Sequence, residues 1–474
     1  MRNLKRALSL ALASVMVLGM TVVGTGASYT DVTSKQNQEA IEVLQAVGIM
    51  VGDNNGNFNP DQKVTRNEMA VVMSNLMDYR AATYAGTSPF TDVPSWAEPY
   101  VAACWTNGIT SGYTKTTYGG SDTVTTSQAA LMLMKTLGYF QYSSDFGSDW
   151  QFATIKQAGK IDLFDDVDSG VREAMTRNDL AQLVLNALET PTVEAEKDGQ
   201  DIEVNGVTIS SNVKYNYITS SKDYAKAIDK DRTTANDGTK LNGNTVELGE
   251  KLYNGDLTKE DGYDDFGRPA SVWEYQAKEV GTYADKADTV FTAKVTSKKL
   301  YDAVGKTATD NYDWTVSVNG EEVKYTGKNL ASNKTDDDAD FIYKALGDDK
   351  ITGNGVVTEV FVDGTEKTVD VAVINYYAAE VYEVKKDDGT ITLSSFYGPA
   401  DTNDEFDATD FEEDEIVMYS FANNEIQEVY AAEKLEGDVT RVRSDATGTE
   451  ELNGDNFVVD GTTYKYNATM AAGD

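Results

Sequence analysis

Two arginines stand at the same position of a phrase that the chain repeats. Three copies of this phrase are present: V-T-R-N-E-M-A at 64–70, V-T-T-S-Q-A-A at 124–130 and M-T-R-N-D-L-A at 175–181. Arg66 and Arg177 occupy the third position of the first and last copies, where the middle copy has Thr126. A guanidinium group can hold a carboxylate through two parallel hydrogen bonds. The chemistry that these two arginines offer is therefore the binding of an anion.

The remaining positions of the phrase are explained by helix physics alone. Thr65 followed by Glu68 is a capping box, in which each side chain bonds to the backbone at the start of a helix. Losing such a cap costs about 1 kcal/mol. The arginine is different, because a cation at the first helical position opposes the helix dipole by roughly 0.3–1 kcal/mol, whereas a helix N-terminus attracts anions. We expect the two arginines either to bind an anionic ligand or to pair with a carboxylate of the chain, such as Asp31 or Glu68.

Composition restricts the chemistry further. The 474 residues include no histidine, which excludes Ser-His-Asp and Cys-His catalysis and every histidine-ligated metal site. The single cysteine, Cys104, cannot form an intramolecular disulfide, and its apolar surroundings predict a buried thiol. The formal net charge is -37. A surface of this charge repels nucleic acid and anionic membranes, so neither is expected as a partner.

The N-terminus reads as an export signal. Arg2, Lys5 and Arg6 precede an apolar run that ends at the small residues 25–27. This pattern predicts a signal peptide over residues 1–27, with a retained membrane anchor as the alternative. No later segment of the sequence is apolar enough to span a bilayer, so attachment to a cell would require another means.

The phrase belongs to a longer repeat. We expect repeat one at 28–88, repeat two at 89–143 and a degenerate repeat three at 144–190. In repeat one a helix-period apolar pattern ends at Gly48, a polar loop follows, and the phrase then opens a second helix. Repeat two has the same order around Gly108.

The order of these elements resembles the S-layer homology (SLH) repeat. Repeat one reads Y-T-D-V, then G-I-M-V-G-D-N-N-G-N-F-N-P-D-Q-K-V-T-R-N-E-M-A, and repeat two opens with F-T-D-V-P-S-W-A. The resemblance implies a multidomain protein whose repeats form a pseudo-threefold α-helical bundle. It also implies non-covalent attachment to an anionic secondary cell-wall polysaccharide, often one that carries pyruvate ketals.

The resemblance also implies which residues line the grooves between repeats: Asp31, Gly48, Arg66, Asp92, Trp96, Gly108 and Arg177. A pyruvate ketal would supply the carboxylate for the arginines. Trp96 would stack on a sugar face, or it is a core residue. Repeat one lacks this tryptophan, repeat two has Thr126 for the arginine, and repeat three lacks the Asp-Val opening. One or two working grooves are therefore expected, and the copy with Thr126 is expected to bind least.

Other sequence motifs give weaker indications of function. The segment Asp53–Asn57 resembles a calcium loop, but the glycine and glutamate that an EF-hand requires are replaced by Phe58 and Val64. Acidic clusters at 336–338 and 412–415 are expected to be solvated loops, although loose calcium binding there stays open. No cofactor is expected, and no nucleotide-binding or serine-hydrolase motif is present.

The rest of the sequence predicts β structure. We expect a linker at 191–200 and two or three small β-rich modules over 201–474, and residues 191–474 together carry 59 acidic and 28 basic residues. A hairpin is predicted over 381–393 and a helix near 297–304. Residues 464–469 resemble one strand of an unfinished hairpin.

The sequence thus predicts a secreted surface protein, wall-anchored through its repeats, that could also associate with copies of itself in a surface layer. Two alternatives remain at this stage: a wall-anchored enzyme acting on glycan or peptide, and an adhesin, each with its activity in the β-rich part. A cleft of converging carboxylates, or of serine and lysine, would favour the enzyme.

Overall fold

The structure is a computed structural model. It describes residues 29, 31–32, 37–197, 202–204, 207–209, 213–229, 240–337, 341, 352–408, 411–443 and 456–467. The predicted signal peptide at 1–27 lies outside the described residues, as do parts of the acidic cluster at 336–338. Within the described part of the chain, no helix combines the length and apolar character needed to cross a membrane.

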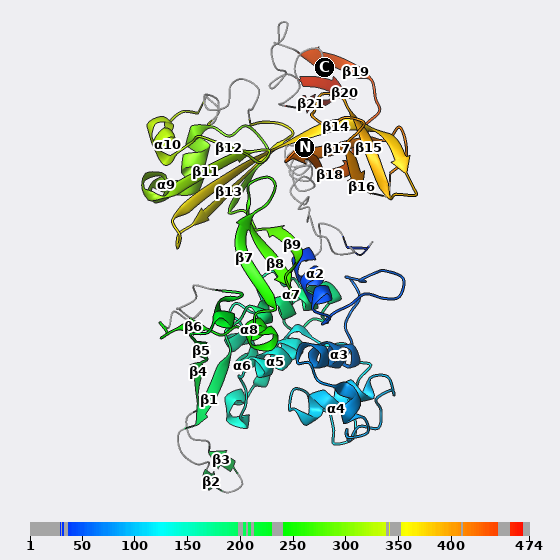
Figure 1. Cartoon of the computed structure of the whole chain (residues 1–474), viewed down its shortest axis with the longest axis vertical. Coiled ribbons are helices and arrows are strands. Elements are labelled where there is room, and N and C mark those ends of the chain that lie inside the picture. Colours follow the sequence, from blue (N-terminus) through cyan, green and yellow to red (C-terminus); the bar gives the residue numbers. More distant parts are fainter. Residues whose placement is uncertain are drawn as a thin grey trace. The chain divides into compact units, whose positions relative to one another are not determined.

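The chain divides into two compact units. The N-terminal unit takes the described residues within Gly24–Glu260 and Val272–Gly281, and the C-terminal unit takes those within Asp261–Ser271 and Thr282–Asp474. The first begins with helices and the second is mainly sheet, so the predicted order of a helical region followed by a β-rich region is confirmed (Figure 1).

Helices build the first part of the N-terminal unit. They are α2 (Gln38–Ala46), α3 (Arg66–Leu76), η1 (Ala81–Tyr84), α4 (Glu98–Thr106), α5 (Thr126–Thr136), η2 (Ser143–Phe146), α6 (Trp150–Ala158) and α7 (Arg177–Leu188). Each copy of the repeated phrase opens a helix, namely α3, α5 and α7. The thiol of Cys104 on α4 is fully buried, as predicted, and burial raises its pKa to about 12.

The first residues of the three phrases bond to one another in a closed cycle. The amide of Val124 donates to Val64 O at 2.9 Å, the amide of Val64 donates to Met175 O at 3.0 Å, and the amide of Met175 donates to Val124 O at 2.9 Å. All three side chains are buried. The phrase therefore does more than start a helix, because its first residue also joins the three repeats.

The N-terminal unit continues beyond the repeats. Where a linker was expected, Val193–Lys197 forms strand β1 and pairs with β4 (Val213–Tyr217), and Thr192 and Val193 are buried. The structure thus differs from the prediction, since residues 191–197 pack onto the repeats: the amide of Val193 donates to Leu137 O at 2.8 Å. The smaller elements that follow are β2 (Ile202–Val204), β3 (Val207–Ile209), β5 (Thr219–Ser220), η3 (Asp223–Lys226), β6 (Asn244–Thr245) and α8 (Leu248–Tyr253).

A three-stranded sheet follows, formed in order by β7 (Leu257–Tyr263), β8 (Pro269–Tyr275) and β9 (Lys278–Ala284). The boundary between the two units runs through this sheet. On β8 the indole of Trp273 is fully buried and donates to Glu39 of α2 at 2.6 Å. The first helix of the repeats is therefore held by a strand more than 200 residues further along the chain, which no local pattern predicts.

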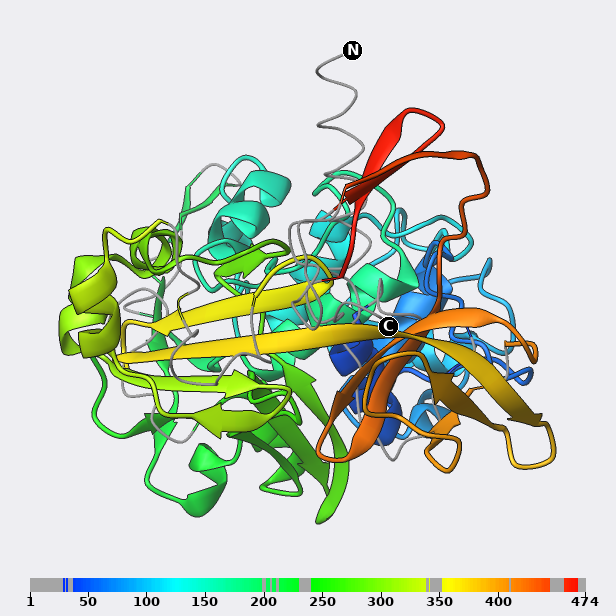
Figure 2. The ribbon, with the colours of Figure 1, turned by 90° about the horizontal axis from the view of Figure 1, so that it is seen from above.

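The C-terminal unit is organised by one long strand. Strand β14 (Thr368–Lys385) pairs over its first half with β13 (Val356–Asp363) and, in parallel, with β11 (Asp313–Val318). Its second half pairs with β15 (Thr390–Ser395) and β17 (Ile416–Ala422). Figure 2 shows β13 and β14 side by side, with β14 continuing into the part of the sheet that β15 and β17 form. Each half of β14 has its own apolar core.

The remaining elements of this unit are β10 (Thr289–Phe291), α9 (Ser297–Asn311), β12 (Glu321–Val323), α10 (Gly327–Asn333), β16 (Glu405–Asp407), β18 (Glu425–Ala431), β19 (Val439–Arg443), β20 (Asn456–Val459) and β21 (Thr462–Lys465). The predicted hairpin is confirmed, because Val381 pairs with Leu393. The predicted helix is α9. The predicted unfinished strand is corrected over the described residues, since β21 pairs with β20 through a turn at Asp460 and Gly461, both with positive φ.

Candidate anion-binding site

The three phrase helices begin in the same way. Thr65, Thr125 and Thr176 each precede a helix and accept a hydrogen bond from the backbone three residues later. The first two form complete capping boxes, as predicted. In the third copy the carboxylate of Asp179 instead accepts hydrogen bonds from the amide and hydroxyl of Ser169, so it secures the loop of repeat three.

The helix ends themselves are not open to a ligand. The first two amides of α3 donate to carbonyls of Asp122 and Gly120 in repeat two, at 2.9 Å each. The corresponding amides of α5 donate into repeat three, and those of α7 donate to carbonyls of repeat one. The expectation that the helix dipole and free amides would hold an anion is therefore wrong for these helices, because their N-terminal amides already have partners.

Arg66 reaches across to repeat two. Its Nε donates to Tyr118 O at 3.1 Å and its Nη2 donates to Ser111 O at 2.8 Å. Its guanidinium carbon lies 4.7 Å from the ring centre of Tyr113 and 4.5 Å from that of Tyr118. The residue is only 8% exposed, and within the described part of the chain its side-chain hydrogen bonds are made by Nε and Nη2, which leaves Nη1 without one. Among the described residues neither Asp31 nor Glu68 forms an ion pair with Arg66, and the charge of Arg66 is instead one of the causes that lower the pKa of Asp92.

Arg177 repeats this geometry against repeat one. Its Nε donates to Phe58 O at 2.7 Å, its Nη2 donates to Val51 O at 3.0 Å, and its guanidinium carbon lies 4.6 Å from the centre of the Phe58 ring. Burial lowers the pKa of this guanidinium. At the equivalent place in the middle copy, the hydroxyl of Thr126 donates to Ser169 O of repeat three at 3.3 Å. In all three copies, the side chain at the third position of the phrase therefore donates a hydrogen bond to a loop of another repeat and not to its own.

Asp31 and Asp92 shape the loops that receive these arginines. Asp31 accepts from the amides of Phe58 and Asn59 at 2.7 and 2.6 Å. Asp92 accepts from the amides of Tyr118 and Gly119, both at 2.8 Å. The amide of Tyr118 is the main cause that lowers the pKa of Asp92. Each carboxylate thus holds the residue whose carbonyl meets Nε of the arginine.

The two predicted glycines end helices. Gly48 and Gly108 both have a φ of 75°, the left-handed conformation that favours glycine after a helix, and no atom lies within 4 Å of where a Cβ would stand. The carbonyl of Gly108 accepts a hydrogen bond from Lys135 Nζ at 2.8 Å. Gly108 is in this way connected to the same pocket as Arg66.

Trp96 is not a core residue. It is 56% exposed, in the turn before α4, which rules out the alternative of a buried tryptophan. It does not belong to the residues that line the pocket described next. The structure leaves it available for stacking without bringing it to Arg66.

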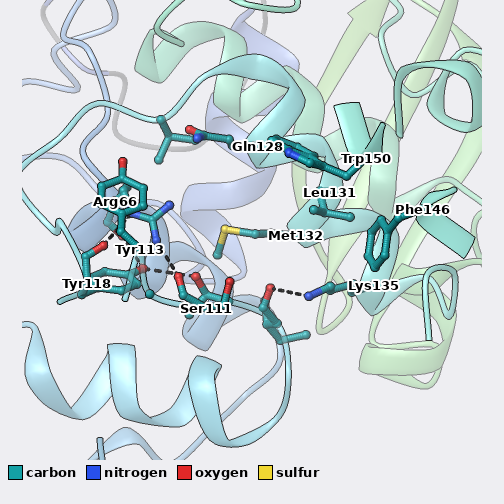
Figure 3. Close-up of a pocket in the computed structure, with 14 residues that line it drawn as sticks. Arg66, Ser111, Tyr113, Tyr118, Gln128, Leu131, Met132, Lys135, Phe146 and Trp150 are labelled. Atoms are coloured by element: carbon teal, nitrogen blue, oxygen red, sulfur yellow. Dashed lines mark hydrogen bonds between the residues drawn. The ribbon is translucent and has the colours of Figure 1, made fainter. Parts of the chain in front are cut away.

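A pocket of about 440 Å³ opens at Arg66. We call it the Arg66 pocket, and Figure 3 shows Arg66 and Tyr113 toward one end and Lys135 and Phe146 toward the other, with Met132 between them. Its walls come from the loop of repeat two, from α5, and from η2 and α6 of repeat three. The full set of lining residues is Arg66, Ile109, Thr110, Ser111, Gly112, Tyr113, Tyr118, Val124, Gln128, Leu131, Met132, Lys135, Phe146 and Trp150.

The charge of this pocket is the opposite of the charge of the chain. Two of its lining residues, Arg66 and Lys135, are cationic, and none is acidic, although the chain has 78 acidic residues. Burial lowers the pKa of Lys135, whose Nζ donates to the carbonyls of Gly108 and Ile109 and, among the described residues, to no carboxylate. Two cations in a pocket whose lining contains no carboxylate can together hold a bound anion.

Of the residues that line this pocket, sequence reasoning named only Arg66 as a site residue, and Lys135, Tyr113 and Trp150 are among those it missed. Lys135 lies in the last turn of α5, where a basic residue also suits the helix dipole, so nothing marked it as a ligand. Tyr113 and Trp150 are 55% and 36% exposed, and their role depends on which loops meet. The one available signal was the surplus of aromatic residues in the polar loops of the repeats.

The loop at Asp53–Asn57, which resembles a calcium loop in sequence, closes on itself. The carboxylate of Asp53 accepts from the amides of Asn55 and Asn57 and from the side chain of Asn59, and the amide of Asn57 is the main cause that lowers its pKa to about 2. Across the described residues, no group of three or more acidic or cysteine side chains is placed to hold a metal ion.

Comparison with known proteins identifies the class. Residues 28–70 and 89–130 match the S-layer homology domain. The chain therefore carries S-layer homology domains and is an S-layer-like surface protein, as the repeats predicted. Predicted repeat three lies outside the matched residues, although it contributes α6 and α7 to the same unit.

Relatives extend the similarity. A cell surface protein of Thermoanaerobacter kivui is 24% identical over 394 residues, which cover 79% of this chain and 44% of that protein. The surface-layer 125 kDa protein of Lysinibacillus sphaericus is 29% identical over 181 residues, or 37% of this chain and 15% of that protein. An exported protein at the cell surface, as predicted, is confirmed by these matches.

One relative is an enzyme. The amylopullulanase of Thermoanaerobacterium thermosulfurigenes is 24% identical over 179 residues, which cover 34% of this chain and 10% of the enzyme. This chain spans less than half the length of the curated relatives it matches. The similarity to the T. kivui protein must reach into the β-rich part, because it covers 79% of the chain.

Proposed function

We propose that the chain anchors itself to an anionic wall polysaccharide and that the Arg66 pocket binds a carboxylate-bearing sugar of it. The observation that carries this proposal is that Arg66 and Lys135 both line the pocket while none of its lining residues is acidic, in a chain of net charge -37. Because no carboxylate in the pocket lining balances these two positive charges, a bound anion would stabilise them.

The geometry suggests how such a sugar would be held. Arg66 Nε and Nη2 are already used, so Nη1 would donate to the carboxylate while Lys135 contributes a second charge-assisted bond. The ring of Tyr113 and the indole of Trp150 would form apolar walls for the sugar, and Gln128 offers an amide to its hydroxyls. A pyruvate ketal fits this description.

We further propose a pseudo-threefold arrangement with unequal grooves. It is supported by the closed cycle of hydrogen bonds through Val64, Val124 and Met175. In this arrangement Arg66 bonds to the loop of repeat two, Arg177 bonds to the loop of repeat one, and Thr126 bonds to the loop of repeat three. The groove expected to bind least is then the one at the loop of repeat three, because the side chain that enters it is uncharged.

For the β-rich region we propose an outward-facing structural role, including association with other copies in a surface layer, without catalysis. Because one relative is named as an amylopullulanase, we also considered catalysis by the β-rich region. Asp264 and Asp265 do line a pocket with Glu321, but Asp264 is bound to Arg268 at 2.6 Å and Asp265 accepts from Asn423. Carboxylates engaged in this way are poor candidates for acid–base catalysis.

Co-sedimentation with wall fragments tests the anchoring. The secreted form of the full chain should pellet with wall fragments that retain their polysaccharide and remain in solution when the polysaccharide has been removed chemically. Lys135→Gln and Arg66→Lys should each weaken binding by about tenfold, since a hydrogen bond to a charged group contributes about 1.5–3 kcal/mol. Equal pelleting with both kinds of fragment would overturn the proposal.

Two matched variants control for charge alone. Lys115 and Arg80 are exposed residues of the same repeats and do not line the pocket. Lys115→Gln and Arg80→Lys should therefore leave binding unchanged. A loss of binding in these controls equal to that of the pocket variants would mean that general charge, and not the pocket, determines attachment.

A further inference from the structure

A second hollow of about 480 Å³ lies next to the Arg66 pocket. We call it the Phe152 pocket after the residue that is 66% exposed at its edge. It is built by η2, by α6 and by Tyr215 of β4, a strand that follows the repeats. Its main side chains are Phe140, Phe146, Phe152, Lys156, Lys160 and Tyr215.

The two pockets share one wall. Phe146 lines both of them, and Figure 3 shows its ring beside Lys135 at the end of the Arg66 pocket. The ring of Phe146 stacks on Phe140, with centres 5.1 Å apart and planes at 12°. A glycan chain bound in the Arg66 pocket would therefore reach the Phe152 pocket by passing over the ring of Phe146.

The wall from β4 is held in place. The hydroxyl of Tyr215 donates to Asp145 at 2.5 Å and accepts from the amide of Gln141 at 3.2 Å. Its ring also packs against Tyr139, with centres 5.3 Å apart. The wall formed by Tyr215 is thus held in place before any ligand arrives, which reduces the entropic cost of binding against it.

The two pockets differ in charge. The Arg66 pocket has two cations and no acid, whereas the Phe152 pocket has two lysines and two aspartates. Asp149 accepts from the amides of Gln151 and Phe152, and Asp145 accepts from Tyr215, so both carboxylates are engaged. A balanced lining of this kind gives no net attraction for an anion, but it offers donors and acceptors beside exposed aromatic rings.

We propose that the Phe152 pocket binds an uncharged sugar that adjoins the charged sugar of the same glycan. This inference rests on the proposed function, because it needs the charged sugar in the Arg66 pocket. The C–H face of the sugar would cover the exposed ring of Phe152, and its hydroxyls would bond to Lys156 and Lys160. The binding surface would then include β4, a strand outside the repeats.

Titration calorimetry with glycan fragments tests this inference. The probes are wall polysaccharide fragments of several sugars and the single acidic sugar isolated from them, and the protein is the secreted form of the full chain. The parent should bind the longer fragments more tightly. Phe152→Ala should weaken their binding about fivefold or more, at low and at high salt alike, and leave binding of the single acidic sugar unchanged. Phe152→Trp should retain the parent affinity.

The matched control is Phe396→Ala, which removes a similarly exposed ring, 53% accessible, from the C-terminal unit and should change neither affinity. If the parent binds the single sugar and the longer fragments equally, or if Phe152→Ala weakens both or neither, this inference is overturned and the proposed function stands. If the parent binds neither probe, the proposed function itself fails.

Discussion

Two buried arginines, one in each unit, are neutralised in different ways. Arg66 is 8% exposed, and within the described part of the chain its guanidinium donates to two backbone carbonyls and lies over two tyrosine rings, with no carboxylate in direct contact. Arg268 is 3% exposed and pairs with Asp264 at 2.6 Å and with Glu359 at 3.4 Å. A buried charge requires compensation. Arg268 has it within the protein, whereas Arg66 has only part of it, and the remainder is available to a ligand.

Carboxylates in the two regions differ in a parallel way. Asp92 is exposed, and hydrogen bonds from backbone amides, first that of Tyr118, lower its pKa. Glu359 and Asp370 are buried in the sheet, and burial raises the pKa of both. The repeats thus use charges at their surface to fix loops, while the C-terminal unit encloses charges at a cost in stability. This contrast can be tested by removing one charge at a time.

The largest effect is expected for Arg268→Met. It would leave Asp264 and Glu359 without their cation inside the C-terminal unit, and breaking a buried pair in this way costs about 3–5 kcal/mol. Hydrogen exchange measured by mass spectrometry along a urea series would report each unit separately. The C-terminal unit should unfold at much lower urea, while wall binding by the repeats at low temperature stays intact.

Arg66→Met is the matched comparison. This substitution leaves no buried carboxylate without its cation, so the N-terminal unit should lose less stability than the C-terminal unit loses in Arg268→Met. Wall binding, in contrast, should disappear. If the two variants cost the same free energy, the distinction between a compensated and an uncompensated arginine would be wrong.

A smaller effect is expected for Asp92→Asn. The amide can accept only one of the two backbone hydrogen bonds well, so the loop at Tyr118 should loosen at a cost of about 1 kcal/mol, because the site is exposed. The folded-state pKa of Asp92 lies below its unfolded value of 3.8. Its stabilisation is therefore present above that value and is lost as the pH falls through the folded-state pKa.

Urea unfolding at pH 7 and near pH 3 would measure this dependence. The difference between parent and Asp92→Asn should shrink at the lower pH, whereas Asp122→Asn, an exposed residue of the same repeat, should show no such change. Wall binding should also weaken in Asp92→Asn, since the carbonyl of Tyr118 positions Arg66. An unchanged affinity would show that Arg66 does not depend on this loop.

Local features of the fold were predictable from the sequence. The capping boxes at Thr65 and Thr125, the left-handed Gly48 and Gly108, and the hairpin that pairs Val381 with Leu393 all depend on residues close together in the chain. Such features follow from short-range hydrogen bonding and backbone freedom. The repeats could be recognised because they reproduce these signals at regular intervals.

The contacts that the long side chains make with other repeats were not predictable from the sequence. Arg66 was expected at a helix end and in a groove between repeats, but the sequence did not show that its guanidinium bonds to Ser111 and Tyr118 of the next repeat. Lys135 and Trp150 join the same pocket only because the three repeats close into a cycle. The strand at 193–197 was likewise hidden, because its partner β4 and the carbonyl of Leu137 are distant in sequence.

The smallest effect, and one of opposite sign, is expected for Asp370→Asn. Asp370 is 4% exposed and accepts from the hydroxyl of Tyr263 at 3.2 Å, a bond that an amide oxygen can also accept. Because burial raises its pKa above the unfolded value of 3.8, its ionisation disfavours the folded state: stability is full below that value and is lost as the pH rises through the folded-state pKa.

Removing this charge should therefore stabilise the C-terminal unit at pH 7 by up to about 1 kcal/mol, and the gain should vanish as the pH approaches 3. Asp387→Asn, an exposed residue of the turn between β14 and β15, should alter stability at neither pH. Destabilisation by Asp370→Asn at pH 7 would mean that the carboxylate is held by favourable bonds, as Asp92 is, and the contrast between the two units would then not extend to their acids.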